Sequence, residues 1–192
     1  MKKVLIINGH PDRESFNWAL AKTYTEAAHK ANAKVETINL VDLHFDPVLK
    51  YGYRKPYPLE PDLETAIKKM KEAEHLVWVF PMWWYGVPAL LKGFIDRTFL
   101  PGITFKYQKG KLFPSKLLKG KTARIIVTAD TISWYNRLVM RNPAINQFKK
   151  GVLEFCGVKP VKVTYLAPIK DSTLNQRKEL LRKIQKLGEG LQ

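Results

Sequence analysis

The sequence predicts a doubly wound α/β fold, in which helices cover both faces of a mostly parallel sheet. Short runs rich in Val, Ile and Leu alternate five times with longer segments whose apolar residues recur at helical spacing. Some of the short runs are apolar almost throughout, which is typical of parallel strands covered on both faces. Domains usually run about 100–200 residues, so we expect a single domain over residues 1–192.

Five segments are predicted to be strands. KVLIIN is a short β-branched run, and HLVWVF is the next buried run. KVETINL alternates apolar and polar residues, as a strand at the edge of a sheet does. In chain order the predicted strands are Lys3–Asn8, Lys34–Leu40, His75–Phe80, Thr122–Thr128 and Val161–Leu166.

Five segments are predicted to be helices because their apolar residues lie three and four positions apart. The last of them, for example, places Leu180, Ile184 and Leu187 on one face. In chain order the predicted helices are Ser15–Asn32, Pro61–Ala73, Val87–Phe99, Asn142–Phe155 and Leu174–Leu191.

Binding loops are expected at one edge of this sheet. Crossovers between parallel strands are right-handed, and ligands bind outside the carboxyl ends of the strands, where the strand order reverses. The loops that follow strands one, three and four are therefore candidates: Gly9–Ser15, Pro81–Gly86 and Ala129–Arg141. The last of these is long, as are Val41–Glu60 and Leu100–Gly120, and long loops in compact domains are usually functional or bound to a partner.

Cysteine usage and hydropathy narrow the class of protein. The lone Cys156 excludes an internal disulfide framework and a cysteine-built metal site, and it suits a reducing compartment. We expect it to be a buried packing thiol. The apolar run Val4–Ile7 is too short for a secretion signal, and no stretch approaches the roughly 20 apolar residues of a membrane span. A cytoplasmic protein is expected.

The net charge of +16 is concentrated in the second half of the chain. Residues 106–192 carry 19 Lys and Arg against 5 Asp and Glu, whereas residues 1–105 carry 14 against 12. Two interpretations stay open: a solvated lysine-rich face, or a surface for a phosphorylated cofactor, an acidic protein or a membrane surface. No recognised nucleic-acid-binding motif accompanies the charge, so nucleic acid is not an expected partner.

The first candidate loop, NGHPDRESFN, combines a histidine with the start of a helix. It lacks both the GxGxxG fingerprint and the Walker Lys-Ser/Thr pair, so a Rossmann dinucleotide site and a P-loop are not supported. Ser15 and Asn17 lie where free N–H groups and the helix dipole favour an anion such as phosphate. Simple N-capping by Ser15 is the alternative. His10 is either a donor to phosphate oxygens or a structural residue.

The second candidate loop, Phe80–Gly86, has the sequence FPMWWYG. A loop cannot bury Trp83, Trp84 and Tyr85 on one side, so core packing does not explain them. At a sheet edge they would form a flat apolar platform, with backbone N–H groups for the heteroatoms of a planar ring such as isoalloxazine. A dimer interface also favours Trp and Tyr, and it is compatible with this interpretation.

Other chemistries have little support. The histidines are scattered without ligand spacing, and no metal site is expected: they are His10, His29, His44 and His75. No GxSxG elbow nominates a nucleophile.

GHPDRESFN, then FPMWWYGVPALLKGFIDRTF, then a late LEFCGV resemble the NAD(P)H:quinone oxidoreductase family of flavodoxin-like flavoproteins. The motifs occur in the family's order and cover most of the chain. The resemblance implies a flavodoxin-like three-layer sandwich with a five-stranded parallel sheet of order 2-1-3-4-5. It also implies hydride transfer from NAD(P)H through FAD or FMN to a quinone or similar acceptor, in a homodimer with sites at the interface.

The resemblance also assigns site residues by position. The flavin phosphate and ribityl region would be held by His10, Ser15, Phe16 and Asn17. The ring would be lined by Pro81, Met82, Trp83, Trp84 and Tyr85.

The third loop departs from the family. The family usually has Thr-x-Gly-Gly here, whereas Thr128-Ala-Asp-Thr131 lacks both glycines and introduces the side chain of Asp130. Thr128 and Asp130 remain expected cofactor contacts. Tyr135 lies where the family often has a tyrosine close to flavin and acceptor. It is therefore a candidate for proton or hydrogen-bond assistance, with a packing role in a lid as the alternative.

Two further functions stay open. Some relatives in this family bind and activate membrane potassium-efflux systems, so the chain could be an ancillary regulatory subunit that docks through its basic half. A flavodoxin-like electron carrier is the third hypothesis, disfavoured because small carriers tend to be acidic.

Overall fold

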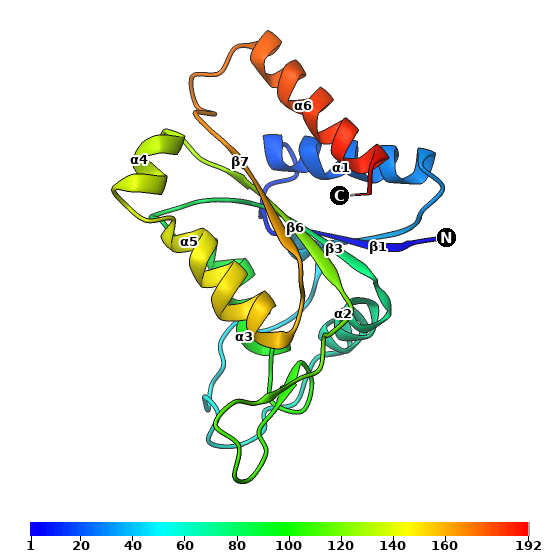
Figure 1. Cartoon of the computed structure of the whole chain (residues 1–192), viewed down its shortest axis with the longest axis vertical. Helices are drawn as coiled ribbons and strands as arrows, with labels where there is room; N and C mark the ends of the chain where they lie inside the picture. The colour runs from blue at the N-terminus through cyan, green and yellow to red at the C-terminus, as the bar shows by residue number, and fades with distance from the viewer. Residues whose placement is uncertain (192) are drawn as a thin grey trace.

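The computed structural model describes residues 1–191 and has three layers, with a twisted parallel sheet in the middle (Figure 1). The order β2-β1-β3-β6-β7 confirms the predicted order, because the two strands missing from this sheet form a separate hairpin. All neighbouring strands of the sheet run parallel. The strands are β1 (Lys3–Asn8), β2 (Lys34–Asn39), β3 (His75–Pro81), β6 (Thr122–Thr128) and β7 (Val161–Leu166).

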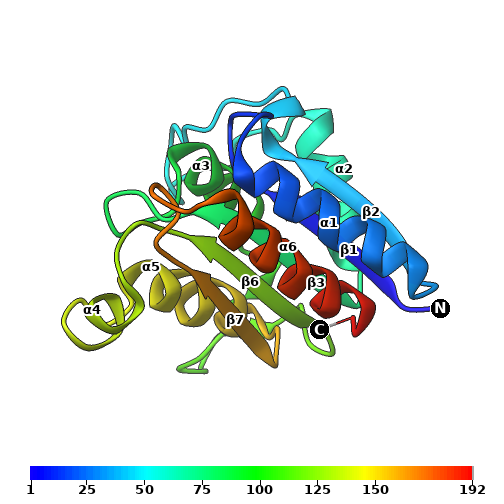
Figure 2. The ribbon, with the colours of Figure 1, turned by 90° about the horizontal axis from the view of Figure 1, so that it is seen from above.

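Helices cover both faces of the sheet, as Figures 1 and 2 show. One face carries α1 (Phe16–Lys30) and α6 (Leu174–Glu189). The other face carries α2 (Pro61–Glu72), α3 (Ala89–Thr98), α5 (Pro143–Asn146) and its continuation η2 (Gln147–Glu154). Alternate residues of each strand feed the two cores: in β1, Leu5 and Ile7 pack on the α3 side, and Val4 and Ile6 pack on the α1 side.

Local capping residues set several helix starts. The Ser15 hydroxyl accepts a hydrogen bond from the N–H of Trp18 at the start of α1. Thr173 and Gln176 form a reciprocal capping box at the start of α6. For four of the five predicted helices, the first and last residues both lie within two positions of the predicted bounds.

The remaining differences lie in the long connections and in the fourth helix. The segment predicted as the helix Asn142–Phe155 begins at Pro143 and becomes π-helical from Gln147, a change of hydrogen-bond pattern that side-chain periodicity does not report. The connections also contain short elements that sequence patterns miss: η1 (Leu40–Asp42), the hairpin of β4 (Phe105–Lys106) and β5 (Ser115–Lys116), and α4 (Ser133–Leu138).

The connection from η1 to α2 is anchored by a fully buried guanidinium on α3. Arg97 donates hydrogen bonds to both carboxylate oxygens of Glu60, at 3.2 and 2.8 Å. It also donates to the carbonyl oxygens of Asp46 (2.5 Å) and Pro58 (2.8 Å). Its guanidinium carbon lies 4.4 Å from the ring centre of Tyr57. This connection is therefore part of the packed structure.

Gly93 permits close contact between the same connection and α3. A Cβ at this position would lie 2.3 Å from the Cβ of Pro47 and 2.8 Å from its backbone, so the connection would have to move. We expect Gly93→Ala to lower the free energy of unfolding by about 1–3 kcal/mol, as overpacking does. Chemical denaturation measures this. Gly151→Ala, where an added Cβ meets nothing within 4 Å, is the matched control and should not be destabilised.

Candidate functional site

The three predicted loops meet at one edge of the sheet. β3 is paired with β1 on one side and β6 on the other, with Asn8 opposite Val79 and Pro81 opposite Thr128. The segments that follow these strands therefore leave the sheet side by side, and hydrogen bonds and a ring contact join them. The N–H of Met82, for instance, donates to the carbonyl of Thr128 at 2.7 Å.

The first loop is ordered by its own side chains. Asn8 is buried, and its Oδ1 accepts from the N–H of His10 at 3.2 Å. The Nδ1 of His10 accepts from the N–H of Asp12 at 3.0 Å, so Nε2 carries the proton of the neutral imidazole. Burial lowers the pKa of His10, and the attraction of Asp12 only partly opposes this. His10 thus presents a neutral N–H donor at this edge.

The pKa of His10 is a testable consequence of this arrangement. We expect NMR titration to place it below the ordinary value of 6.5. The folded protein then binds fewer protons than the unfolded chain just below pH 6.5, so this group reduces stability as the pH falls through that range. The variant His10→Gln assigns the resonance and should remove this contribution. A pKa at or above 6.5 would show that the attraction of Asp12 outweighs burial.

The start of α1 supplies donors beside this loop. Phe16 and Asn17 occupy its first turn, where backbone N–H groups have no partner within the helix. The side chain of Asn17 is buried, and its Oδ1 accepts from the hydroxyl of Thr128 at 2.7 Å. Among residues 1–191, no acceptor lies within hydrogen-bond distance of its Nδ2. A buried amide donor without a partner beside a helix N-terminus is suited to an anionic or polar ligand.

The aromatic segment forms a tight turn in an unfavourable backbone conformation. Trp83 and Gly86 exchange two backbone hydrogen bonds of 3.1 and 2.8 Å. Between them, Trp84 and Tyr85 have φ angles of 50° and 56°, a left-handed pair typical of a type I′ turn, which usually contains Gly or Asn. Such conformations cost about 1–3 kcal/mol per residue and cluster at functional sites.

This turn exposes the aromatic surface that the sequence predicts. Trp84 is fully exposed (100%), and Trp83 is partly exposed, with its ring 5.5 Å from that of His10. Within the described chain, the backbone N–H groups of Trp84 and Tyr85 meet no acceptor. Pro81 and Met82, by contrast, are buried beneath the turn, and the N–H of Met82 is used by the sheet. Two of the five predicted ring-lining residues are therefore buried, and a third, Tyr85, is half-buried.

The third loop, which lacks the glycines of the family, is held by hydrogen bonds to a neighbouring loop. The carboxylate of Asp130 accepts from the N–H groups of Lys170 (2.7 Å) and Ile169 (3.3 Å) in the connection from β7 to α6. The side chain of Asp130 is thus engaged by a neighbouring loop. Tyr165, which the sequence analysis did not identify, donates its hydroxyl to the carbonyl of Thr131 at 2.7 Å. Burial raises the pKa of Tyr165 to about 12, so the hydroxyl keeps its proton.

Tyr135 lies on α4, next to the third loop. Its ring is partly exposed and packs edge-to-face on Trp134, with ring centres 5.8 Å apart. This pair forms an aromatic surface after β6, at the same edge as the other two loops.

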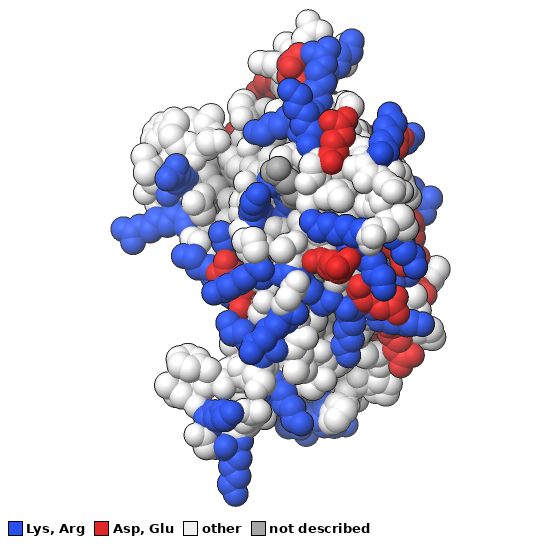
Figure 3. Space-filling view, turned by 45° about the vertical axis from the view of Figure 1, so that its right-hand side comes forward, with Lys and Arg blue, Asp and Glu red and all other residues white. Residues whose placement is uncertain are grey.

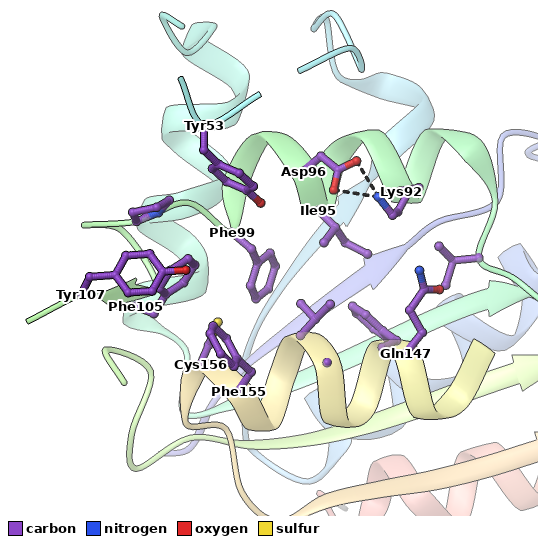
Figure 4. Close-up of a pocket in the computed structure, with 15 residues that line it drawn as sticks. Tyr53, Lys92, Ile95, Asp96, Phe99, Phe105, Tyr107, Gln147, Phe155 and Cys156 are labelled. Atoms are coloured by element: carbon purple, nitrogen blue, oxygen red, sulfur yellow. Dashed lines mark hydrogen bonds and ion pairs between the residues drawn. The ribbon is translucent and has the colours of Figure 1, made fainter. Parts of the chain in front are cut away.

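An aromatic cavity lies elsewhere, between α3 and η2, and none of the predicted site residues lines it (Figure 4). Its volume is about 500 Å³. The walls are mainly aromatic and aliphatic, and Lys92 and Asp96 form an ion pair at its rim with contacts of 2.8 and 2.7 Å. Cys156 lies in the wall, and burial raises the pKa of its thiol, which disfavours the reactive thiolate. The sequence offered no local pattern for this cavity, since its lining comes from distant segments.

Two features of the described residues bear on other functions. No group of three or more His, Cys, Asp or Glu side chains is arranged to hold a metal ion among residues 1–191. Within the same range, none of the helices combines the length and apolar character needed to cross a membrane.

Comparisons with known proteins place this geometry in a family. A family model described as a flavodoxin-like fold matches residues 2–188. A ribosyldihydronicotinamide dehydrogenase [quinone] from Pongo abelii is 30% identical, over 82% of this chain and 78% of that protein. NAD(P)H dehydrogenase [quinone] 1 from Cavia porcellus is 28% identical, over 94% of this chain and 74% of its own length. The crystal structure of Smu.1420 from Streptococcus mutans superposes with a TM-score of 0.85 and 33% identity, covering 98% of this chain and 99% of that one.

Proposed function

Since this chain belongs to the flavodoxin-like fold family, we propose that it is a flavin-dependent NAD(P)H oxidoreductase that passes a hydride from NAD(P)H through bound flavin to a quinone or similar acceptor. One observation carries the proposal: the exposed aromatic turn Trp83–Gly86 lies at the same sheet edge as the start of α1, which has free donors. The names of the two mammalian relatives, both quinone dehydrogenases, support the acceptor class.

The residues present fit a flavin, either FAD or FMN. The indoles of Trp83 and Trp84 offer a flat apolar surface for the ring, and the free N–H groups of Trp84 and Tyr85 offer donors for its polar edge. The first turn of α1 and the unpaired Nδ2 of Asn17 suit a phosphate. When bound, a flavin supplies the ability to accept and release a hydride.

The roles of the chain's own residues follow from these contacts. Ser15 fixes the start of α1, so that Phe16 and Asn17 direct their N–H groups to the phosphate. His10 donates from Nε2 as a neutral group, and the Thr128 hydroxyl holds the Asn17 amide in orientation. In this proposal Asp130 positions the third wall through the β7–α6 connection and does not itself touch the cofactor.

Tyr135 is proposed to assist at the acceptor through its hydroxyl. Its position on α4 after β6 brings it to the correct edge, and its partial exposure leaves the hydroxyl accessible. Tyr135→Phe should lower turnover with a quinone and leave flavin content unchanged.

A homodimer is part of the proposal. The aromatic cavity between α3 and η2 and the fully exposed Trp84 are apolar surfaces that a second copy would cover. Light scattering on the purified protein measures the mass. A mass of one chain at micromolar concentration would overturn this part of the proposal.

Flavin content and NAD(P)H oxidation test the function itself. The purified protein should show the visible absorbance of a flavin or bind added FMN or FAD, and the flavin released by heat identifies the cofactor. It should oxidise NADPH or NADH when a simple quinone is added. Protein that binds neither flavin would overturn the proposal. Protein that binds flavin without oxidising NAD(P)H would instead support an electron carrier.

A further inference from the structure

The connection from α3 to β6 carries a hairpin that projects from the end of the molecule opposite α6 (Figure 1). The strands β4 and β5 pair antiparallel at its base, and residues 107–114 form its tip. Tip and base together span residues 105–116. Neither helical layer covers the tip, which extends beyond the sheet and the helices as a separate lobe.

The hairpin and its flanks are purely basic. No acidic residue occurs between Asp96 and Asp130, and residues 106–121 contain six lysines. The ammonium groups of Lys106, Lys109 and Lys111 are exposed, and none of them forms an ion pair with any residue of the described chain. Figure 3 shows lysine side chains on the projecting lobe without a neighbouring acidic group on this face.

The same tip exposes large apolar side chains. Leu112 is 89% exposed and Phe113 is 75% exposed. Single exposed apolar residues are ordinary, but two adjacent ones at the tip of a projecting loop, beside unpaired lysines, form a combined surface. Such a surface can insert its apolar groups into the headgroup region of a bilayer while its cations contact anionic lipids.

A groove at the base of the hairpin also combines basic and apolar side chains. Its volume is about 550 Å³, and it combines three lysines with an apolar floor. One acidic side chain, Glu154, also lines it and is paired with Lys149 at 4.0 Å. The groove is lined by Phe113, Pro114, Lys116, Lys150, Glu154, Phe155 and Lys159. An anionic headgroup would find cations here directly beside apolar walls.

We propose that the hairpin docks the protein peripherally on an anionic lipid surface. Each lysine near such a surface strengthens binding about fivefold, and insertion of Leu112 and Phe113 adds an apolar contribution. A protein partner is less well matched, since a specific interface needs about 800 Å² per partner, whereas the tip is small and convex. The inference extends the proposed function, because a lipid-soluble quinone acceptor would lie in the same bilayer.

Vesicle flotation of the full chain tests the proposal. We expect the protein to float with vesicles that contain phosphatidylglycerol, much less with pure phosphatidylcholine, and less as salt is raised. Lys109→Glu with Lys111→Glu should weaken binding at least about 25-fold, from the two lysine contributions. Leu112→Ser with Phe113→Ser should weaken the binding that persists at high salt.

A matched control separates the hairpin from general charge. Lys178→Glu with Lys183→Glu makes the same change of net charge on exposed positions of α6, at the opposite end of the molecule (Figure 1), and should retain binding within about fivefold. Equal loss in both charge variants, or no preference for anionic vesicles, would overturn the proposal. So would a hairpin variant that changes the oligomeric mass, since a second copy would then occupy the tip. Flotation requires no flavin, so docking and the proposed redox function fail independently.

Discussion

Replacing Arg97 with leucine is expected to lower the free energy of unfolding by about 3–5 kcal/mol, because it removes the fully buried partner of an ion pair with the half-buried Glu60. The fully buried guanidinium satisfies Glu60 and the carbonyls of Asp46 and Pro58 at once. Leucine would leave all these acceptors without their donor and would release the connection between η1 and α2 from α3. Chemical denaturation, followed by circular dichroism, measures the loss.

An exposed ion pair on the same helix provides the control. Lys92 and Asp96 are partly exposed and four residues apart, and Lys92→Met should cost less than about 1 kcal/mol. A loss of similar size in Arg97→Leu would show that the guanidinium does not anchor the connection.

The Arg97 variant should also change the pH dependence of stability. Burial acts to raise the pKa of Glu60, but hydrogen bonds from backbone N–H groups and from Arg97 lower it below the ordinary 4.5. A carboxylate with a lowered pKa stabilises the fold above that value, and this contribution is lost as the pH falls through the folded-state pKa. Arg97→Leu should therefore lose less stability than the parent protein as the pH falls below 4.5.

Asn17→Asp is expected to weaken flavin binding at least about a hundredfold, if the first turn of α1 holds the flavin phosphate. Aspartate has nearly the same shape and can still accept the hydrogen bond of Thr128 through one oxygen. The unpaired Nδ2 donor, however, is replaced by a second acceptor on a carboxylate. A like charge close to the phosphate costs several kcal/mol at this buried position, and about 2.7 kcal/mol already corresponds to a hundredfold change in Kd.

The matched control is Asn175→Asp, at the same second position of an α-helix, in α6. Aspartate in a first turn is favourable to the helix dipole at both sites, but position 17 is buried and position 175 is exposed, so Asn17→Asp is also expected to lower the free energy of unfolding. Fluorescence titration with FMN and FAD measures affinity, and circular dichroism checks the fold. Unchanged flavin affinity in Asn17→Asp would show that the phosphate does not bind at this helix start. A loss of flavin affinity in both variants would instead indicate a general charge effect.

The parts of the site that depend on neighbouring residues were predictable from the sequence. Ser15 and Asn17 are recognisable as a helix start, and the aromatic run after a buried strand predicts an exposed surface, which Trp83 and Trp84 form while Tyr85 is half-buried against the core. The doubly wound pattern then brings both to one edge of the sheet. The left-handed turn at Trp84 and Tyr85 was not predictable, because neither residue type favours that conformation and only the two hydrogen bonds across the turn impose it.

The sequence by itself determined the fold class and the edge at which the loops meet, because hydrophobic periodicity and caps depend on residues a few positions apart. The strand order was implied by the family resemblance. Only the tertiary structure decided the partners of polar side chains. Thr128 binds Asn17 across 111 positions, and Asp130 turns to Lys170 across 40. Such partners are selected by packing, since a buried or half-buried polar group must find its hydrogen bond wherever the folded chain supplies one. For the same reason, the glycines missing from the third loop became interpretable only when the connection from β7 to α6 was seen to occupy the Asp130 carboxylate.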